Sequence, residues 1–305
     1  FFWWCSLYRF STVLTIASSS VKEEIIENMK IGFDESESCV RFFFDNKVDL
    51  NNCIVCIENN KIISSLHIIP TKIYGESGLI PVDYIYAATT LPEYRLKGYM
   101  SRLIEASNQI SYLRGNRASI LIPANEKLFE FYNKLGYKSF YKYKKVIISN
   151  FQMKNFMHKA NICTKNLSFE NVFNMYLKNH INLGDTIWDK SSVEYAFNMN
   201  EFLDGINVYT NDGYAICYIQ KQNTVKIAEF STIPSDVYNL LGNIYYRLPN
   251  HNFYEIILPA NYNHINITGK IFNHGLIKPY TSELKYFIKK ISDGAIDPYF
   301  SFTLE

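Results

Sequence analysis

The sequence of 305 residues lacks the features that mark several common classes of protein. Its six cysteines have no regular spacing, which in a chain of this length predicts reduced thiols rather than a disulfide framework. The six histidines form no H-x-x-x-H or H-E-x-x-H spacing. The C-x-x-C pair, Cys53 and Cys56, lies in a strand-like run where the two side chains should point to opposite faces. We therefore expect no metal site.

Net charge is also low, and long apolar runs are few. The formal net charge is only +2, with no long run of one sign, so neither nucleic acid nor a membrane is the expected partner. Residues 1–20 are apolar at the start and serine-rich at the end, but Arg9 interrupts them and the apolar run is too short to span a bilayer. We interpret them as an extension outside the core fold or as the source of a first strand, Thr12 to Ile16. A cleaved signal is the alternative.

The most informative stretch runs from Tyr84 to Gly115. It has no G-K-[ST] and no three-glycine spacing, so it is neither a P-loop nor a dinucleotide fingerprint. A β-prone run, residues 84–90, leads through the basic loop Arg95-Leu96-Lys97-Gly98 into an amphipathic helical pattern. A helix entered in this way offers unpaired N–H groups and the positive end of its dipole. Gly98 lets the backbone approach an anion closely, so the stretch predicts a phosphate or pyrophosphate site.

Two segments in this region resemble a known family. Arg95-Leu96-Lys97-Gly98-Tyr99-Met100 resembles the Q/R-x-x-G-x-G/A motif of the GNAT superfamily, the acetyl-CoA-dependent N-acetyltransferases, although Met100 stands where Gly or Ala is usual. Downstream, the run from Asn125 to Tyr137, NEKLFEFYNKLGY, is similar to the superfamily segment N-x-x-(x)-x-x-x-Y-x-K-x-G-F/Y. The chain as a whole resembles the bacterial two-domain acetyltransferases related to the enhanced-intracellular-survival family.

The resemblance implies a set of site residues. Backbone groups of the strand before the loop would bond the pantetheine and the thioester oxygen, and loop amides would hold the pyrophosphate of coenzyme A. Asn125 would contact the cofactor, cap a helix, or do both. Tyr132 would be the general acid that protonates the departing thiolate. The cofactor-binding residues implied are Ala87, Ala88, Thr89, Arg95, Leu96, Lys97, Gly98, Tyr99, Met100 and Asn125.

The general base stays open at this stage. Asp83, Glu93 and the carboxylates of Glu305 are candidates, and Glu305 joins Tyr132 as a catalytic candidate because the terminal carboxylate reaches the active site in related two-domain enzymes. The acidic segment 34–37 could attract a cationic amine, but acids are also common where a helix begins, because they complement the helix dipole.

The order of expected elements agrees with this family over residues 21–150: two helices, three antiparallel strands, then β-α-β-α-β, with residues 144–148 as the last strand. Residues 151–305 repeat part of that order of helices and strands, with a final segment near 272–278 and an aromatic last strand at 297–305. Residues 231–234, STIP, stand where the basic turn should be. We therefore predict an α/β chain with mixed (α+β) sheets and tandem GNAT folds, the first with the acetyl-CoA site and the second degenerate.

The function that follows is transfer of an acetyl group from acetyl-CoA, as co-substrate, to a primary amine of a small molecule or peptide. A non-catalytic acyl-CoA-binding sensor is the alternative. A third reading, an aminoacyl-tRNA-dependent peptide ligase, is disfavoured by the intact coenzyme A loop and the modest charge. The expected location is the cytoplasm, where coenzyme A chemistry takes place, and a homo-oligomer is left open.

Overall fold

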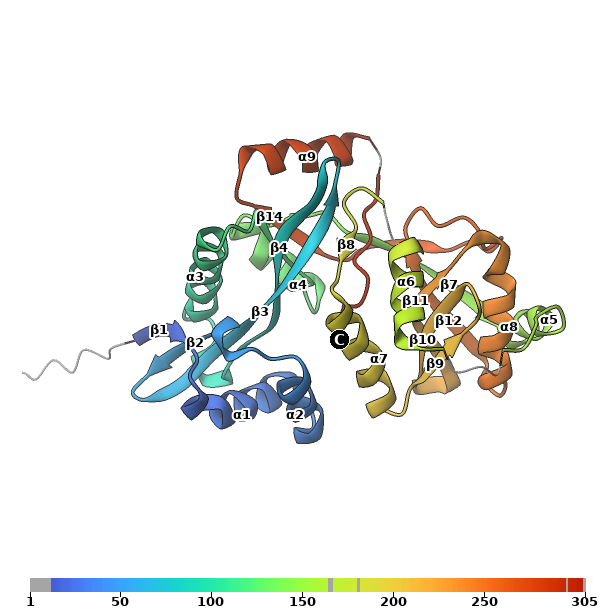
Figure 1. Cartoon of the computed structure of the whole chain (residues 1–305). Coiled ribbons are helices and arrows are strands. Elements are labelled where there is room, and N and C mark those ends of the chain that lie inside the picture. Colours follow the sequence, from blue (N-terminus) through green and yellow to red (C-terminus); the bar gives the residue numbers. More distant parts are fainter. Residues whose placement is uncertain (1–11, 164–166, 180–181, 295, 304–305) are drawn as a thin grey trace, which may run out of the picture. The chain divides into compact units, whose positions relative to one another are not determined.

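The computed structural model describes residues 12–163, 167–179, 182–294 and 296–303 (Figure 1). The chain divides into two compact units. The first is built from the residues up to Pro70 together with Asp83–Gly115, and the second from Thr71–Val82 together with Asn116 onward. The prediction of a mixed α/β chain with two sheets is confirmed.

From Thr12 onward, the described part of the first unit is a small antiparallel sheet with three α-helices. It contains β1 (Thr12–Ile16), α1 (Lys22–Phe33), α2 (Glu37–Asn46), β2 (Cys53–Glu58), most of β3 (Lys61–Gly75), most of β4 (Gly78–Thr90), α3 (Tyr99–Leu113), and the short 3-10 helices η1 (Ser19–Val21), η2 (Leu50–Asn52) and η3 (Pro92–Tyr94). β2 pairs with β1 on one side and β3 on the other, with Cys53 opposite His67. β4 is the next strand after β3 in the sheet. Just beyond β4, Leu91 N–H donates to the carbonyl of Ile63 at 2.9 Å.

Residues at the helix ends of this unit explain where α1 ends and α2 begins. Ser36 caps α2, since its Oγ accepts from the backbone N–H of Cys39 at 3.2 Å. Asp34 ends α1 in the left-handed conformation. α1 and α2 form a hairpin (Figure 1). They bury Ile25 and Phe43 among their apolar side chains.

Pro70 lies inside a strand. The residues around it form the single strand β3, which pairs with β2 as far as His67 and with β8 (Thr186–Ile187) from Lys72 onward. Pro70 lies between these two pairings, so on this side of the strand its missing N–H removes no ladder bond.

The second unit has two groups of strands. Its elements are β5 (Ala118–Leu121), α4 (Glu126–Lys134), β6 (Lys138–Ser139), β7 (Lys142–Ser149), α5 (Asn150–Met157), α6 (Phe169–Asn179), β8, α7 (Lys190–Phe202), β9 (Ile206–Tyr209), β10 (Gly213–Gln220), η4 (Lys221–Asn223), β11 (Thr224–Thr232), η5 (Pro234–Asp236), α8 (Val237–Arg247), β12 (Phe253–Pro259), β13 (Lys270–Asn273), β14 (Leu276–Pro279) and α9 (Ser282–Asp293). One sheet has the order β13-β7-β12-β11-β10-β9. All its pairs are antiparallel except β11 with β12.

Two strands lie in the sheet opposite to the one expected. β7, predicted to complete the first GNAT fold, instead pairs with β12 and β13, with Ile148 opposite Tyr254. β14, predicted as a late segment of the second fold, pairs with β5 and β6, with Leu276 opposite Leu121. The alternating pattern of a strand specifies which face is buried but not which partner it pairs with, so sequence could not assign either strand to its sheet.

The second half of the chain nevertheless repeats the element order of the first. Apart from the short strand β8 between α6 and α7, the order α6, α7, β9, β10, β11, α8, β12 matches the order α1, α2, β2, β3, β4, α3, β5. In the second half β11 and β12 are parallel neighbours joined by α8, and α5 packs beside α8 (Figure 1). Their core includes Val146, Leu240 and Ile256, all at most 1% exposed.

The aromatic end of the chain is not a strand over its described part. Residues 296–303 have no ladder partner. Single main-chain bonds hold them, such as that from Thr186 N–H to the carbonyl of Tyr299 at 3.1 Å. Side chains add to these: Trp188 Nε1–H donates to the carbonyl of Ser301 at 2.7 Å, and the carboxylate of Glu229 accepts from the N–H of Phe302. Tyr299, Phe300 and Phe302 are buried. Apolar alternation here reflects burial between elements rather than strand pairing.

Candidate functional site

The loop that leads from β4 into α3 is the centre of the candidate site. Gly98 is the residue before the helix and has φ +80°, ψ +5°. No side chain caps the first turn of α3, and the first helical bond runs from Arg102 N–H to the carbonyl of Gly98 at 3.2 Å. The N–H groups of the opening turn are therefore oriented outward at the positive end of the helix dipole.

The loop geometry leaves room for an anion. Leu96 also has a positive φ, +63°, although it carries a side chain, and that side chain is fully exposed. An ideal Cβ at Gly98 would meet nothing within 4 Å. Where right-handed and left-handed backbone conformations alternate, successive main-chain N–H groups point to the same side and form a concave site that can bind an anion. The predicted pyrophosphate loop thus has an uncapped helix start, left-handed backbone and open space at the glycine.

Two basic side chains flank this loop. Arg95 Nε–H donates to the carbonyl of Thr90 at 3.0 Å, which fixes the guanidinium against the end of β4. The ammonium of Lys97 lies 5.1 Å from the ring centroid of Tyr94. Both side chains are on exposed residues, so their charge faces solvent where a polyphosphate would approach.

Tyr99 is buried and serves the packing of α3. Its hydroxyl donates to Glu58 Oε1 at 2.6 Å, and the guanidinium of Arg102 lies 4.8 Å from its ring centroid. The bond to Glu58 is the main cause that raises the pKa of the phenol. The side chain therefore ties the start of α3 to β2. Met100, the next residue, is half-buried.

β4 is irregular at the residues expected to meet the thioester. Ala87 has φ +47°, a left-handed conformation that is unusual for a residue with a Cβ. Ala87 and Ala88 are half-buried, whereas Thr89 is buried and its carbonyl accepts from Ser64 Oγ at 2.8 Å. Strained backbone of this kind redirects peptide groups out of the regular ladder. The structure thus places a distortion at the predicted position in the strand.

Asn125 and Tyr132 lie on α4, in the second unit, whereas the loop and β4 residues lie together in the first. Asn125 caps α4, because its Oδ1 accepts from Leu128 N–H at 3.3 Å. Tyr132 is 8% exposed, with its ring 5.0 Å from Phe131 and 5.9 Å from Tyr137 between centroids. Burial raises the pKa of the Tyr132 phenol to about 12, so it stays protonated at neutral pH.

The candidate bases differ in their surroundings. Asp83 is 2% exposed. Glu93 is exposed, 3.2 Å from the ammonium of Lys61, and its own backbone N–H together with Lys61 lowers its pKa. Glu305 lies outside the described residues. Of the acidic segment, Glu37 pairs with Lys30 at 3.0 Å and with Arg41 at 2.9 Å.

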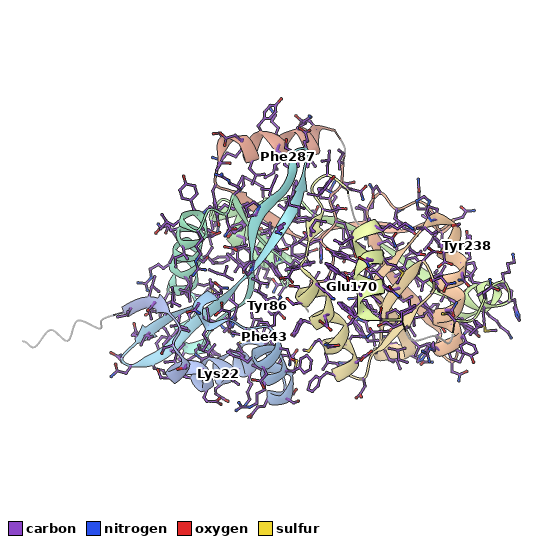
Figure 2. All side chains as sticks on the ribbon, viewed as in Figure 1. Lys22, Phe43, Tyr86, Glu170, Tyr238 and Phe287 are labelled. Carbon is purple, nitrogen blue, oxygen red and sulfur yellow. The ribbon has the colours of Figure 1, made fainter. Side chains whose placement is uncertain are left out.

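One residue that sequence reasoning missed is His67 on β3. Its side chain is 3% exposed, and neither ring nitrogen has a hydrogen-bond partner among the described residues. Burial lowers the pKa of the imidazole to about 3, so the ring is neutral. The rings of Phe43 and Phe44 lie 5.3 and 5.5 Å from it. Phe43 also contacts Tyr86, 5.1 Å away (Figure 2).

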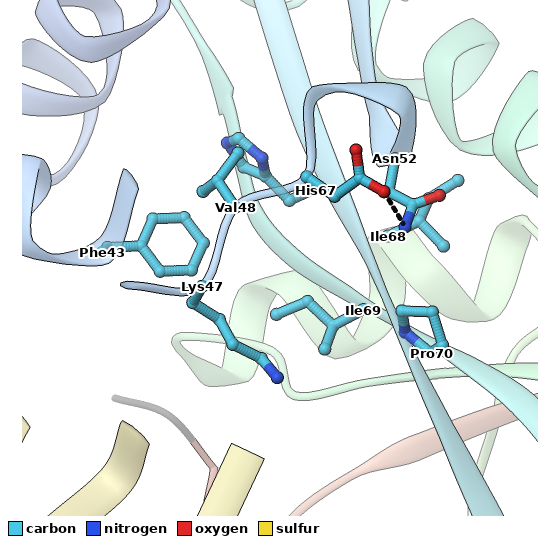
Figure 3. Close-up of a pocket in the computed structure, with 9 residues that line it drawn as sticks. Phe43, Lys47, Val48, Asn52, His67, Ile68, Ile69 and Pro70 are labelled. Carbon is cyan, nitrogen blue, oxygen red and sulfur yellow. Dashed lines mark hydrogen bonds between the residues drawn. The ribbon is translucent and has the colours of Figure 1, made fainter. Parts of the chain in front are cut away.

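His67 lines a pocket of about 90 Å³ between the end of α2 and β3 (Figure 3). Phe43, Val48 and Ile69 supply apolar walls, and Lys47 and Asp49 add charge. The only sequence signal was a histidine inside the alternating apolar run 62–69, at a position where an apolar residue is usual. A buried histidine that is fully bonded in a core would give the same signal.

Two further classes of site were searched for in the described ranges. There, no three His, Cys, Asp or Glu side chains are arranged to hold a metal ion. Nor does any helix among these residues combine the length and apolar character needed to cross a membrane.

Comparison with known proteins identifies the first part of the chain. Residues 15–140 match the family described as the acetyltransferase (GNAT) domain. No curated protein matches the chain.

Several solved structures share the fold. A probable N-acyltransferase of unknown function from Enterococcus faecalis has a TM-score of 0.71 at 16% identity, covering 88% of this chain and 72% of that one. A GCN5-related N-acetyltransferase from Anabaena variabilis gives 0.69 at 16% identity, with coverage of 88% and 72%. Eis1 from Mycobacterium abscessus gives 0.64 at 12% identity, with coverage of 88% and 73%. Residues 15–140 therefore match a GNAT acetyltransferase domain, and the chain as a whole shares the fold of these structures.

Proposed function

We propose that this protein transfers an acetyl group from acetyl-CoA to a primary amine of a small molecule or peptide. The observation that carries the proposal is the start of α3, where a left-handed glycine opens a helix with no side-chain cap inside a GNAT acetyltransferase domain. Main-chain N–H groups of residues 96–100 would hold the pyrophosphate of coenzyme A. The open space at Gly98 supports this role, because an anion needs close approach there.

The irregular part of β4 would receive the thioester. A peptide N–H turned out of the ladder near Ala87 would donate to the thioester oxygen as charge develops on it, and Ala88 and Thr89 would continue along the pantetheine. One preorganised donor of this kind contributes roughly 3 kcal/mol to transition-state stabilisation. The positive φ of Ala87 supports this assignment, because regular strand geometry would direct the N–H to a neighbouring strand.

The amine must lose a proton before it attacks. A lysine-like amine with a pKa near 10.4 is about three pKa units above neutral pH, so deprotonation costs on the order of 4 kcal/mol. Glu305 remains our proposed general base, the group that accepts this proton. Glu93 is less suited because Lys61 already pairs with its carboxylate.

Tyr132 would give its proton to the departing thiolate. A tyrosine with a pKa of about 12 is protonated at neutral pH. An ordinary thiolate, with a pKa near 8.5, is the weaker base of the pair. Burial raises the pKa of a thiol as it raises that of a phenol, so a thiolate formed away from water is a better match for Tyr132.

Replacement of Tyr132 by Phe tests the proposal. We expect turnover to fall by about 10² or more, since a general acid contributes 10²–10⁴-fold, while the affinity for coenzyme A changes little. The matched control is Tyr286→Phe, at an exposed tyrosine on α9. Thiol release from acetyl-CoA across a panel of primary amines gives the rate, and calorimetry gives the affinity for coenzyme A.

Equal losses of turnover and affinity would contradict the acid role. Binding of coenzyme A without thiol release for any amine would favour the sensor function instead.

A further inference from the structure

The chain after α9 forms a strap, residues 296–303, that lies beside β8 in the second unit (Figure 1). These residues have no ladder partner, and single main-chain bonds fix them, such as that from Thr186 N–H to the carbonyl of Tyr299. The three aromatic side chains of the strap are nevertheless at most 3% exposed. Individual contacts, rather than a repeating pattern of hydrogen bonds, therefore decide whether the strap stays in place.

Two buried carboxyl groups bond the strap. Asp185 Oδ1 accepts from the N–H of Tyr299 at 2.7 Å. Glu229 Oε1 accepts from the N–H of Phe302, and the other oxygen of Glu229 lies 3.4 Å from the hydroxyl of Tyr299. Glu229 is thus attached to the strap at two points, one on the main chain and one on a side chain.

Aromatic rings on α6 and β10 pack against the far end of the strap. The ring of Phe302 lies 5.3 Å from that of Tyr176 and 6.1 Å from that of Tyr214, between centroids. With the strap in place, the Glu229 side chain is 5% exposed and has little contact with water. Release of the strap would expose these rings and bring water to the carboxyl group.

The electrostatic surroundings of Glu229 do not favour a negative charge. Three tyrosines interact electrostatically with it, one each on α6, β10 and the strap: Tyr176, Tyr214 and Tyr299. Asp185, beside β8, interacts with two of them. β11 itself carries one lysine, Lys226, whose ammonium lies 5.8 Å from the ring centroid of Tyr218. The tyrosines and Asp185 are acids, so none of them offsets a negative charge on Glu229.

Ionisation of Glu229 is therefore unfavourable while the strap is in place. Burial raises the pKa of its carboxyl group from 4.5 to about 8, and the bonds with Phe302 and Tyr299 oppose this only in part. After release, water would reach the carboxyl group and its pKa would return toward 4.5. Between these two pKa values the released state binds fewer protons, so a rise in pH favours release.

We propose that the strap is a pH-sensitive element that opens locally as the pH rises, with Glu229 as the group that controls it. The protonated carboxyl group keeps residues 299–302 in place, and the ionised group favours their release while the rest of the second unit stays folded. The inference goes beyond the proposed acetyl transfer and does not depend on it, because the opening needs neither substrate.

Hydrogen exchange of the backbone amides of Tyr299 and Phe302 tests the proposal in the natural protein without substrates. Division of the observed rate by the intrinsic rate gives the opening constant at each pH. This constant should rise about tenfold between pH 6.5 and 7.5 and level off above about pH 8. Asp185, whose pKa burial raises to about 6, is mostly ionised over this range and adds little. The amides of β12, which has a partner strand on each side, should show no such rise.

Two variants assign the effect to Glu229. Glu229→Gln removes the ionisation and keeps an acceptor for the N–H of Phe302, so the opening constant of the strap should become independent of pH. The matched control is Glu194→Gln, at an exposed glutamate on α7, which should keep the rise. If Glu229→Gln fails to fold, Tyr299→Phe provides the test. It removes a bond that lowers the pKa of Glu229, so the opening constant should level off at a higher pH.

Three results would overturn the proposal. Exchange of the strap that does not depend on pH after correction would show that no proton controls it. The same rise at β12 would mean that the whole unit unfolds, and an unchanged rise in Glu229→Gln would assign the proton to another group. A rise confined to the strap and lost in Glu229→Gln is the expected result.

Discussion

The buried carboxyl group of Glu229 should make the stability of the protein fall as the pH rises. Glu229 lies on β11 at 5% exposure, accepts from the N–H of Phe302, and lies 3.4 Å from the hydroxyl of Tyr299. Burial raises its pKa from 4.5 to about 8, and the two hydrogen bonds only partly oppose this. At neutral pH the folded protein therefore keeps a proton that the unfolded chain releases.

The sign and size follow from linkage. Below pH 4.5 both states hold the proton and the group favours neither. Between pH 4.5 and about 8 the unfolded state binds fewer protons, so the free energy of unfolding decreases as the pH rises, and the loss is complete above about 8. At 1.36 kcal/mol per pKa unit, the loss is roughly 5 kcal/mol. Release of the segment 299–302 would bring the carboxylate to water at a smaller cost, so this value is an upper bound.

Glu229→Gln removes the ionisation and keeps both hydrogen-bonding positions. Chemical denaturation from pH 5 to pH 9 should show similar midpoints for the two proteins at pH 5 and a more stable variant at pH 9. The control is Glu105→Gln, at an exposed glutamate on α3. Asp185, whose pKa burial raises to about 6, stays in both proteins and contributes a common slope at acid pH. Parallel curves for the variant and the natural protein across this range would refute the reasoning.

Two glycines of the first unit give further predictions. Gly98→Ala should destabilise the fold by only about 1 kcal/mol, the cost of a left-handed Cβ in open space. It should weaken coenzyme A binding by tenfold or more, because the methyl group would lie where the loop amides are proposed to hold the pyrophosphate. Calorimetry with coenzyme A checks this, and unchanged affinity would contradict the loop assignment. Gly32→Ala should destabilise by about 1–3 kcal/mol, because its Cβ would lie 1.9 Å from Thr89 Oγ1. Denaturation should show recovery in the double variant with Thr89→Ala; no recovery would place the strain elsewhere.

Local chemistry was sufficient to predict the loop region. The β-prone run, the basic turn and the amphipathic helix form β4, the loop and α3, because each depends on residues close in sequence. A glycine at the end of such a turn indicates left-handed backbone, and Gly98 has it. The GNAT resemblance of these residues is confirmed by the match over residues 15–140.

The exchange of β7 and β14 between sheets could not be predicted in this way. Both strands have ordinary apolar patterns, and the partner that each pairs with lies far away in sequence. His67 was missed for a related reason. A lone histidine in an apolar run is the same in the sequence whether it is bonded within a core or lines a pocket, and only its neighbours in space distinguish the two.

The sequence by itself therefore determined the order of most elements, the turn that leads into α3 and the family resemblance of residues 15–140, since these depend on short-range patterns and on residue types at fixed spacing. Only the tertiary structure decided which sheet each strand joins, how the residues before the chain end are held by Glu229 and Trp188, and which buried polar group lacks a partner. Pairing, burial and satisfaction of hydrogen bonds are relations between residues distant in the chain, and no local pattern encodes them.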